Sequence, residues 1–171
     1  IYTPCDCIEM RKAVLKAAEV DGPVYIRISR PDVENVTEED APFIPGKATI
    51  LKEGTDVAIM AIGLMVHEAL KAAAMLEKEG ISAVVVSFGS VKPLDKDTIL
   101  AMAGKVKGIV TAEEHTVLGG FGSAVAEVVC GQNVKFAMVC IEDRFGQSGQ
   151  PDELFQAYGL TAEHIYEECK N

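Results

Sequence analysis

Two carboxylates and a histidine precede a cluster of glycines by a few residues in the stretch E-E-H-T-V-L-G-G-F-G-S-A-V-A-E, residues 113–127. A glycine-rich turn that leads into a helix can present backbone N–H groups to a phosphate, and a histidine beside carboxylates can transfer protons. The candidate residues are Glu113, Glu114, His115, Gly119, Gly120 and Gly122. The stretch therefore raises two hypotheses, a phosphate-binding turn and a general acid or base at the carboxyl end of a strand.

The match to a dinucleotide-binding turn is incomplete. The fingerprint has G-x-G-x-x-G or G-x-G-x-x-A directly after the first strand of the sheet. Gly120 and Gly122 fit, but the third position is the branched Val125, and the unit comes late in the chain. Glu142 follows Gly122 at about the spacing of a ribose-binding acid. A nucleotide-binding regulatory module is therefore one alternative. The other is a structural role, in which the glycines turn the chain and the polar residues cap a helix or contact a partner subunit.

Composition excludes several function classes. The 171 residues are 49% hydrophobic, enough for one domain with a sizeable core. A net charge of −10 with scattered Lys and Arg argues against binding of nucleic acid, and no apolar run has the roughly 20 residues that cross a membrane. The five cysteines include no C-x-x-C pair, which predicts no metal site and favours a reducing, cytoplasmic location.

The first 30 residues hold one helix and one strand. Asp6 is a helix N-cap with Glu9 three positions later, and the apolar spacing predicts a helix over 6–21. The alternating segment V-Y-I-R-I-S-R predicts a strand over 24–30. This is too little for an independent core, so we expect the tail of a larger domain. Residues 31–46, with three prolines and an acidic cluster, are expected to form a linker.

Strands and helices alternate in the rest of the chain. A-T-I-L-K and D-V-A-I-M-A-I-G are separated only by E-G-T, which predicts an antiparallel hairpin. A loop is expected from Glu113 to Leu118. Helices are expected at 65–79, 96–103, 123–131, 151–158 and 162–169, and strands at 82–88, 107–112 and 134–141. The pattern predicts a three-layer α/β/α sandwich around a five-stranded, mostly parallel sheet with one antiparallel strand.

Several motifs together resemble the C-terminal part of transketolases. They run in order from D-x-x-E and G-P-V-Y-I-R-I-S-R, through K-P-L-D and the glycine stretch, to F-G-Q-S-G-Q-P-D-E-L-F-Q-A-Y-G-L-T. The similarity is closest to the split type, whose two halves are separate chains. The beta chain of 2-oxoacid dehydrogenases and deoxyxylulose-phosphate synthase share the outline and are alternatives.

The resemblance implies an organisation and an activity. Residues 1–30 would end a pyrimidine-binding domain, and residues 47–171 would be a transketolase C-terminal domain whose first strand is antiparallel. The complete enzyme would be a homodimer of the pentose phosphate pathway that uses thiamine diphosphate and Mg²⁺ to move a two-carbon ketol unit between sugar phosphates. The G-D-G motif is missing, and the glutamate that activates the cofactor would lie upstream of Ile1. We therefore expect this chain to bind no cofactor and to be inactive without an N-terminal section.

One binding residue follows from the resemblance. Arg30 matches the arginine that holds the substrate phosphate in transketolases, and a guanidinium at the end of a strand can grip phosphate oxygens with two hydrogen bonds. Arg27 is a less favoured helper. The alternative for Arg30 is a salt bridge with the linker acids Asp32 or Glu34. No catalytic residue is expected in this chain. The resemblance implies that the glycine stretch has a structural role and does not bind phosphate.

Overall fold

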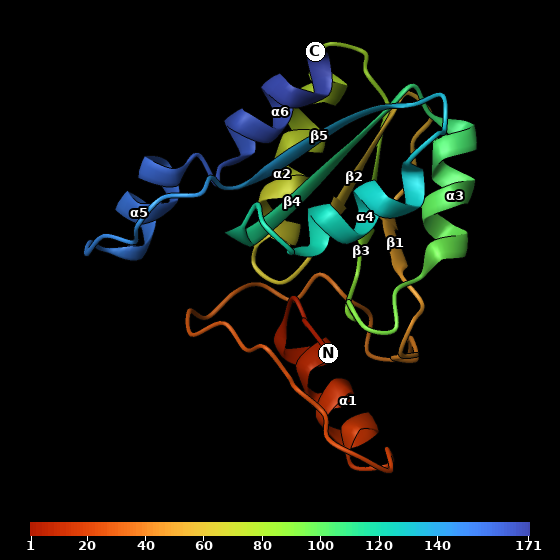
Figure 1. The fold of residues 1–171 in the computed structure, drawn as a ribbon, viewed down its shortest axis with the longest axis vertical. Coiled ribbons are helices and arrows are strands. Elements are labelled where there is room, and N and C mark those ends of the chain that lie inside the picture. The colour runs from red at the N-terminus through yellow and green to blue at the C-terminus, as the bar shows by residue number, and fades with distance from the viewer.

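The computed structural model describes residues 1–171 and contains one five-stranded sheet (Figure 1). The strand order is β1-β3-β2-β4-β5, and only β1 is antiparallel to its neighbour. The strands are β1 (Thr49–Lys52), β2 (Val57–Ala61), β3 (Ala83–Ser87), β4 (Gly108–Thr116) and β5 (Lys135–Ile141). The predicted mixed, mostly parallel sheet is confirmed.

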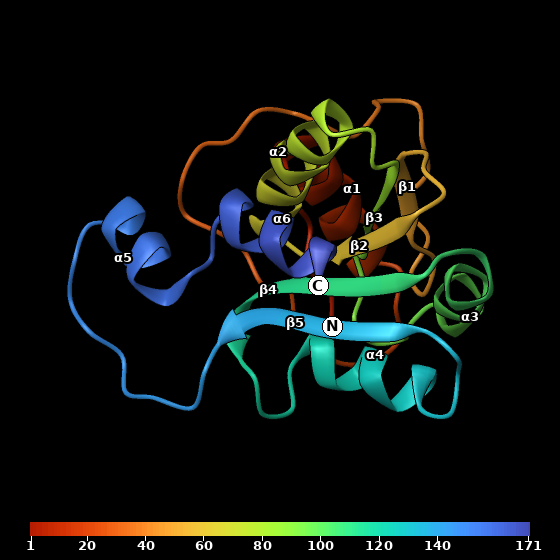
Figure 2. The same ribbon diagram turned by 90° about the horizontal axis from the view of Figure 1, so that it is seen from above.

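Helices cover both faces of the sheet (Figure 2). The helices are α1 (Cys7–Ala17), α2 (Met65–Lys78), α3 (Lys96–Lys105), α4 (Phe121–Val129), α5 (Pro151–Tyr158) and α6 (Ala162–Lys170). The side chains of α2 and α6 share one buried cluster with one face of the sheet, and those of α3 and α4 share a second cluster with the other face. The three-layer α/β/α sandwich is therefore confirmed. No helix has the length and apolar character that crossing a bilayer requires.

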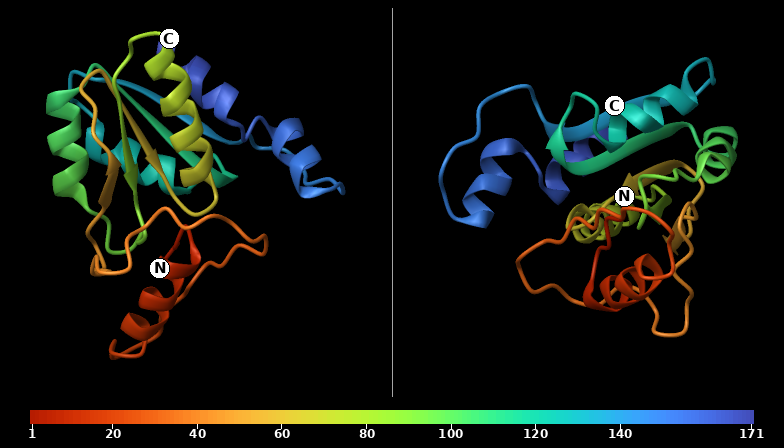
Figure 3. Two further views of the ribbon diagram at one scale, coloured as in Figure 1. Left: turned by 180° about the vertical axis from the view of Figure 1, so that it is seen from behind. Right: turned by 60° about the horizontal axis from the view of Figure 1, so that its bottom comes forward.

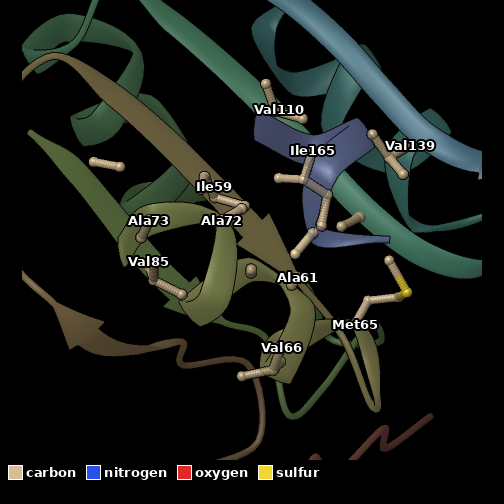
Figure 4. Packing of buried hydrophobic residues seen from close by; sticks show 14 of the residues in the cluster. Ile59, Ala61, Met65, Val66, Ala72, Ala73, Val85, Val110, Val139 and Ile165 are labelled. Atoms are coloured by element: carbon tan, nitrogen blue, oxygen red, sulfur yellow. The ribbon is translucent and has the colours of Figure 1, made fainter. Parts of the chain in front are cut away.

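The centre of the sheet is buried on both sides, which explains its apolar sequence. Every residue of β2 and β3 is buried. Small side chains such as Ala72 and Ala73 let α2 lie close to the branched side chains of Ile59 and Val85 (Figure 4). This packing fixes the strands whose carboxyl ends position the candidate site residues.

The predicted hairpin is wrong, although the antiparallel direction of β1 is right. β1 pairs with β3, with Thr49 opposite Ser87, and not with β2. The E-G-T connection crosses the beginning of β3, where the N–H of Asp56 donates to the carbonyl of Ser82 at 2.8 Å. Only glycine allows this crossing, since a Cβ atom on Gly54 would lie 2.2 Å from the carbonyl carbon of Ala83. The short connection therefore carries the chain from one side of β3 to the other.

The predicted strand over 24–30 is also wrong. The segment is extended, but its backbone hydrogen bonds are those with Tyr2, whose N–H donates to Tyr25 and whose carbonyl accepts from Arg27. A single facing residue makes a β-bridge rather than a strand. Tyr25 and Ile28 remain 65% and 63% exposed.

The N-terminal residues cover the carboxyl end of the sheet (Figure 1). Thr3 donates from its N–H to Gly89 at 2.8 Å and from its hydroxyl to Phe88 at 2.9 Å, just beyond β3. Its carbonyl accepts from Gly63, just beyond β2. Open α/β sheets usually bind ligands at this end. Here that position is occupied by the protein's own chain.

The linker is fastened to the first helix by Asp6. Figure 3 shows the linker passing the beginning of this helix. The carboxylate of Asp6 caps α1 by accepting from the N–H of Glu9, and it also accepts from the N–H groups of Val36 and Thr37 and from the hydroxyl of Thr37, all at 2.7–2.9 Å. The predicted N-cap is therefore confirmed, and the helix ends at Ala17 rather than at residue 21.

Replacing Asp6 by alanine is expected to lower the free energy of unfolding by about 2–3 kcal/mol at pH 7. Burial alone would raise the pKa of Asp6, but hydrogen bonds from the backbone of Glu9, Thr37 and Val36 outweigh it and lower the pKa. A lowered pKa means that this stabilisation is present above the pKa of an unfolded aspartate, about 3.9, and is lost as the pH falls through the folded value. Urea denaturation at pH 7 and pH 3 should show the wild-type advantage shrinking at pH 3. The exposed Asp40→Ala is the control, and an advantage of equal size at both pH values would contradict the role of the carboxylate.

Candidate functional site

The Glu113–His115 segment lies in a strand and not in the predicted loop. Strand β4 continues to Thr116, because β5 runs beside it and Ile141 pairs with Thr116. The register with β5 shifts between Ala112 and Thr116, so β4 is irregular at this end. The three polar residues therefore project from a strand whose position is fixed by its neighbours.

Glu113 caps helix α4. Its side chain is 1% exposed, and its two carboxylate oxygens accept from the N–H groups of Phe121 and Gly122, both at 2.7 Å. A Cβ atom on Gly120 would lie 2.5 Å from this carboxylate, so glycine is needed for the close approach. The N–H groups that a phosphate would use are therefore occupied by the protein's own carboxylate.

Gly122 has a different role in the same turn. A Cβ atom at this position would lie 2.8 Å from the side chains of Thr111 and Met138. Gly122 therefore lets α4 approach β4 and β5 closely. Gly119 has a φ of +73°, which favours glycine there. The glycine stretch is explained by packing and turning, which agrees with the architectural interpretation.

The sequence contains a signal for the buried position of Glu113. Residues of a strand alternate between its faces, and Ile109 and Thr111 face the helix layer that contains α4. Extending this alternation places Glu113 on the same face, beneath the beginning of α4. The buried position of Glu113 was not predicted, because the strand was expected to end at residue 112 and β4 in fact continues to Thr116.

The neighbours of Glu113 have other partners. The ring Nδ1 of His115 lies 3.0 Å from the carbonyl of Thr116, and the side chain is exposed. Glu114 meets Arg27, whose Nη2 donates to the carbonyl of Glu114 at 2.5 Å and lies 3.6 Å from its carboxylate. The structure does not bring the Glu113–His115 side chains together at one acid–base centre.

Arg30 lies in a groove beside helix α5. The groove has a volume of about 350 Å³ and runs between residues 27–31 and α5. The rest of its lining is mostly apolar and includes the charged Glu114 together with Leu64, Ile141, Pro151, Leu154, Phe155, Tyr158 and Leu160. Helix α5 buries none of its residues and stands away from the sheet (Figures 1 and 2).

Arg30 has no anionic partner in the protein. It is exposed and forms no salt bridge with Asp32 or Glu34, the alternative that the sequence left open. A free guanidinium at a groove can accept an anion with two parallel hydrogen bonds. The structure also places Arg27, the less favoured helper, in the same groove.

The remaining groups with metal-binding or nucleophilic chemistry do not form a site. No three His, Cys, Asp or Glu side chains lie together so as to hold a metal ion. Cys5 is buried whereas Cys7 is exposed. Burial and the nearby carboxylates of Glu9 and Asp6 raise the pKa of the Cys5 thiol, which makes it a poor nucleophile.

Comparison with known proteins identifies the family. The model of the transketolase C-terminal domain matches residues 46–165. A 6-deoxy-6-sulfo-D-fructose transketolase subunit of Clostridium sp. strain MSTE9 is 43% identical, over 96% of this chain and 52% of its own length. A putative transketolase C-terminal section of Methanocaldococcus jannaschii is 41% identical over the same shares. A 1-deoxy-D-xylulose-5-phosphate synthase of Heliobacterium modesticaldum is also 41% identical, over 96% of this chain and 26% of its own length.

A solved structure agrees in fold and sequence. A split gene transketolase, described as an inactive beta4 tetramer, superposes with a TM-score of 0.92 at 45% identity, over 99% of this chain and 55% of that chain. The chain thus spans about half the length of the transketolase relatives that it matches. Since the family match extends from the end of the linker into α6 and the sheet has the expected order, the chain belongs to the transketolase C-terminal domain family.

Proposed function

We propose that this chain is the C-terminal part of a transketolase of the split type, which in the complete enzyme moves a two-carbon ketol unit between sugar phosphates. The observation that carries the proposal is the similarity to a split gene transketolase over 99% of the chain, at 45% identity and a TM-score of 0.92. A relative named as a transketolase subunit supports the same assignment. The partner would be the N-terminal section of the enzyme, that is, all of the enzyme that precedes this chain, including the rest of the pyrimidine-binding domain.

We propose the same organisation that the sequence predicts. Residues 1–30 end a pyrimidine-binding domain, residues 31–46 link the domains, and residues 47–171 form the C-terminal domain. The family match, which begins at residue 46, supports the boundary. Exposed apolar side chains on the N-terminal part, with Leu15 at 60% and Tyr25 at 65% exposed, support a larger unit that packs on it.

Arg30 is proposed to bind the phosphate of the sugar substrate. Its unpaired guanidinium and its place in the groove support this role. The assembled enzyme is proposed to be cytoplasmic, to act in the pentose phosphate pathway and to contain a homodimer of this chain, with an N-terminal section bound to each copy. The absence of C-x-x-C pairs fits a reducing compartment.

Thiamine diphosphate and Mg²⁺ are proposed cofactors of the complete enzyme. Thiamine diphosphate supplies the electron sink that lets a carbon–carbon bond next to a carbonyl break. The glycine-rich turn does not offer its N–H groups to the diphosphate of the cofactor, because Glu113 already accepts hydrogen bonds from them. We therefore assign no cofactor contact to this chain.

Reconstitution tests the proposed activity. The chain, the N-terminal section and their mixture are each assayed with thiamine diphosphate, Mg²⁺, a ketose phosphate and an aldose phosphate. Ketol transfer is expected only in the mixture. Transfer by the isolated chain at the same rate would contradict the proposal. A mixture that uses only pyruvate as donor would instead favour the deoxyxylulose-phosphate synthase or 2-oxoacid dehydrogenase alternative, the former supported by the Heliobacterium relative.

A further inference from the structure

Three charged side chains line the groove beside α5, namely Arg27, Arg30 and Glu114. All other lining residues are apolar, apart from Ser29 and Tyr158. The groove therefore has a net charge of +1 at neutral pH. Without Glu114 the same groove would have a net charge of +2.

Glu114 does not need its carboxylate to hold Arg27. The guanidinium donates at 2.5 Å to the backbone carbonyl of Glu114, whereas the carboxylate oxygen is farther away, at 3.6 Å from Nη2. The backbone bond is independent of the side chain at this position. Removing the carboxylate would therefore change the charge of the groove and leave Arg27 in place.

We propose that Glu114 selects the charge of the anionic end of the substrate that enters this groove. The inference rests on the proposed function, because it assumes that Arg30 receives the anionic end of a sugar derivative. The Glu114 carboxylate repels any anion held there, and the repulsion energy is proportional to the anion's charge. Relative to a neutral residue, Glu114 therefore disfavours a doubly charged phosphate more strongly than a singly charged sulfonate.

Because the repulsion energy is proportional to the charge of the anion, the effect of removing the Glu114 carboxylate can be estimated for each anion. For charges several ångströms apart near the surface, with screening by salt, removing the carboxylate should strengthen binding of a singly charged end about two- to threefold. The same change should strengthen binding of a doubly charged end by the square of that factor, about four- to ninefold. A phosphate monoester has a charge of about −1.5 to −2 at pH 7, whereas a sulfonate has a single charge.

The experiment compares Glu114→Gln with the wild type in the enzyme assembled with its N-terminal section. The substrates are a ketose phosphate and the corresponding ketose sulfonate, at pH 7.5 and constant ionic strength. In the variant the KM for the phosphate should fall about four- to ninefold and the KM for the sulfonate about two- to threefold, with kcat unchanged for both. The control Glu127→Gln removes the same charge from an exposed position on α4 and should change neither KM.

Other results of this comparison would overturn either the role of Glu114 or the proposed function. Equal changes in KM for the two substrates, changes no larger than those of Glu127→Gln, or a change in kcat alone would overturn the role of Glu114 and leave the proposed function intact. Absence of ketol transfer by the wild-type assembly would overturn the proposed function and this inference with it. Because Glu114 is partly exposed, the variant should unfold at the same urea concentration as the wild type, which checks that the KM values compare folded enzymes.

Discussion

Replacing Glu113 by glutamine is expected to lower the free energy of unfolding by about 3 kcal/mol. The carboxylate is buried and accepts two hydrogen bonds at 2.7 Å, from Phe121 and Gly122, at the positive end of the α4 dipole. Glutamine has a single oxygen, so its NH₂ group would face one of the two N–H donors and leave it without a partner. An unpaired buried donor costs about 1–3 kcal/mol, in addition to the lost charge-assisted bonds.

The adjacent residue provides the control for this prediction. Glu114→Gln makes the same chemical change, but the side chain is 36% exposed, so the expected loss is within about 0.5 kcal/mol. Urea denaturation of both variants, followed by circular dichroism, measures the difference. Equal losses for the two variants would show that Glu113 does not support α4.

Replacing Arg30 by alanine is expected to lower kcat/KM for a ketose phosphate about 100-fold in the assembled enzyme, which corresponds to about 3 kcal/mol of binding to the phosphate. The guanidinium lies in the groove without a carboxylate partner, so its hydrogen bonds are available for the substrate. Arg30→Lys keeps the charge but not the two parallel hydrogen bonds, and its activity should lie between those of the wild type and the alanine variant.

Two comparisons separate phosphate binding from a general loss of structure. The unphosphorylated ketose should react equally with the wild type and Arg30→Ala, because it has no group for the guanidinium to bind. Arg11→Ala removes an exposed arginine from α1 and should not affect either substrate. If Arg30→Ala and Arg11→Ala gave the same kcat/KM for the ketose phosphate, Arg30 would not be the phosphate ligand.

Apolar spacing and capping residues predicted most helices and strands, because these features act between residues that are close in sequence. The apolar spacing of residues 65–79 places Val66, Ala69 and Ala73 on one helix face, and all three are buried in α2. Asp6 with Glu9 three positions later predicts a helix N-cap, and the side chain of Asp6 accepts from the N–H of Glu9. Such features depend on residues close in sequence.

The errors concern pairing between distant residues. The E-G-T connection fits a hairpin as well as a crossover, and the position of β3 decides between them. Residues 24–30 have the alternation of a strand, but a strand also needs a neighbour, and only Tyr2 faces this segment. The length of β4 likewise depends on β5, which lies beside it as far as Ile141.

The candidate site was predictable in part. The sequence singled out Arg30, Arg27 and Glu114 without indicating that they line one groove, since residues 27–31 and β4 are far apart in the chain. The architectural interpretation of the glycines agrees with the close contacts of Gly120 and Gly122. The reason for those contacts, a carboxylate beneath the beginning of α4, required the three-dimensional arrangement.

We propose that the cofactor of the complete enzyme is held by residues outside this chain. Calorimetric titration with thiamine diphosphate and Mg²⁺ tests it directly, on the isolated chain and on the chain assembled with its N-terminal section. We expect no binding to the isolated chain and saturable, one-to-one binding to the assembly. Tight stoichiometric binding of thiamine diphosphate to the isolated chain would contradict it.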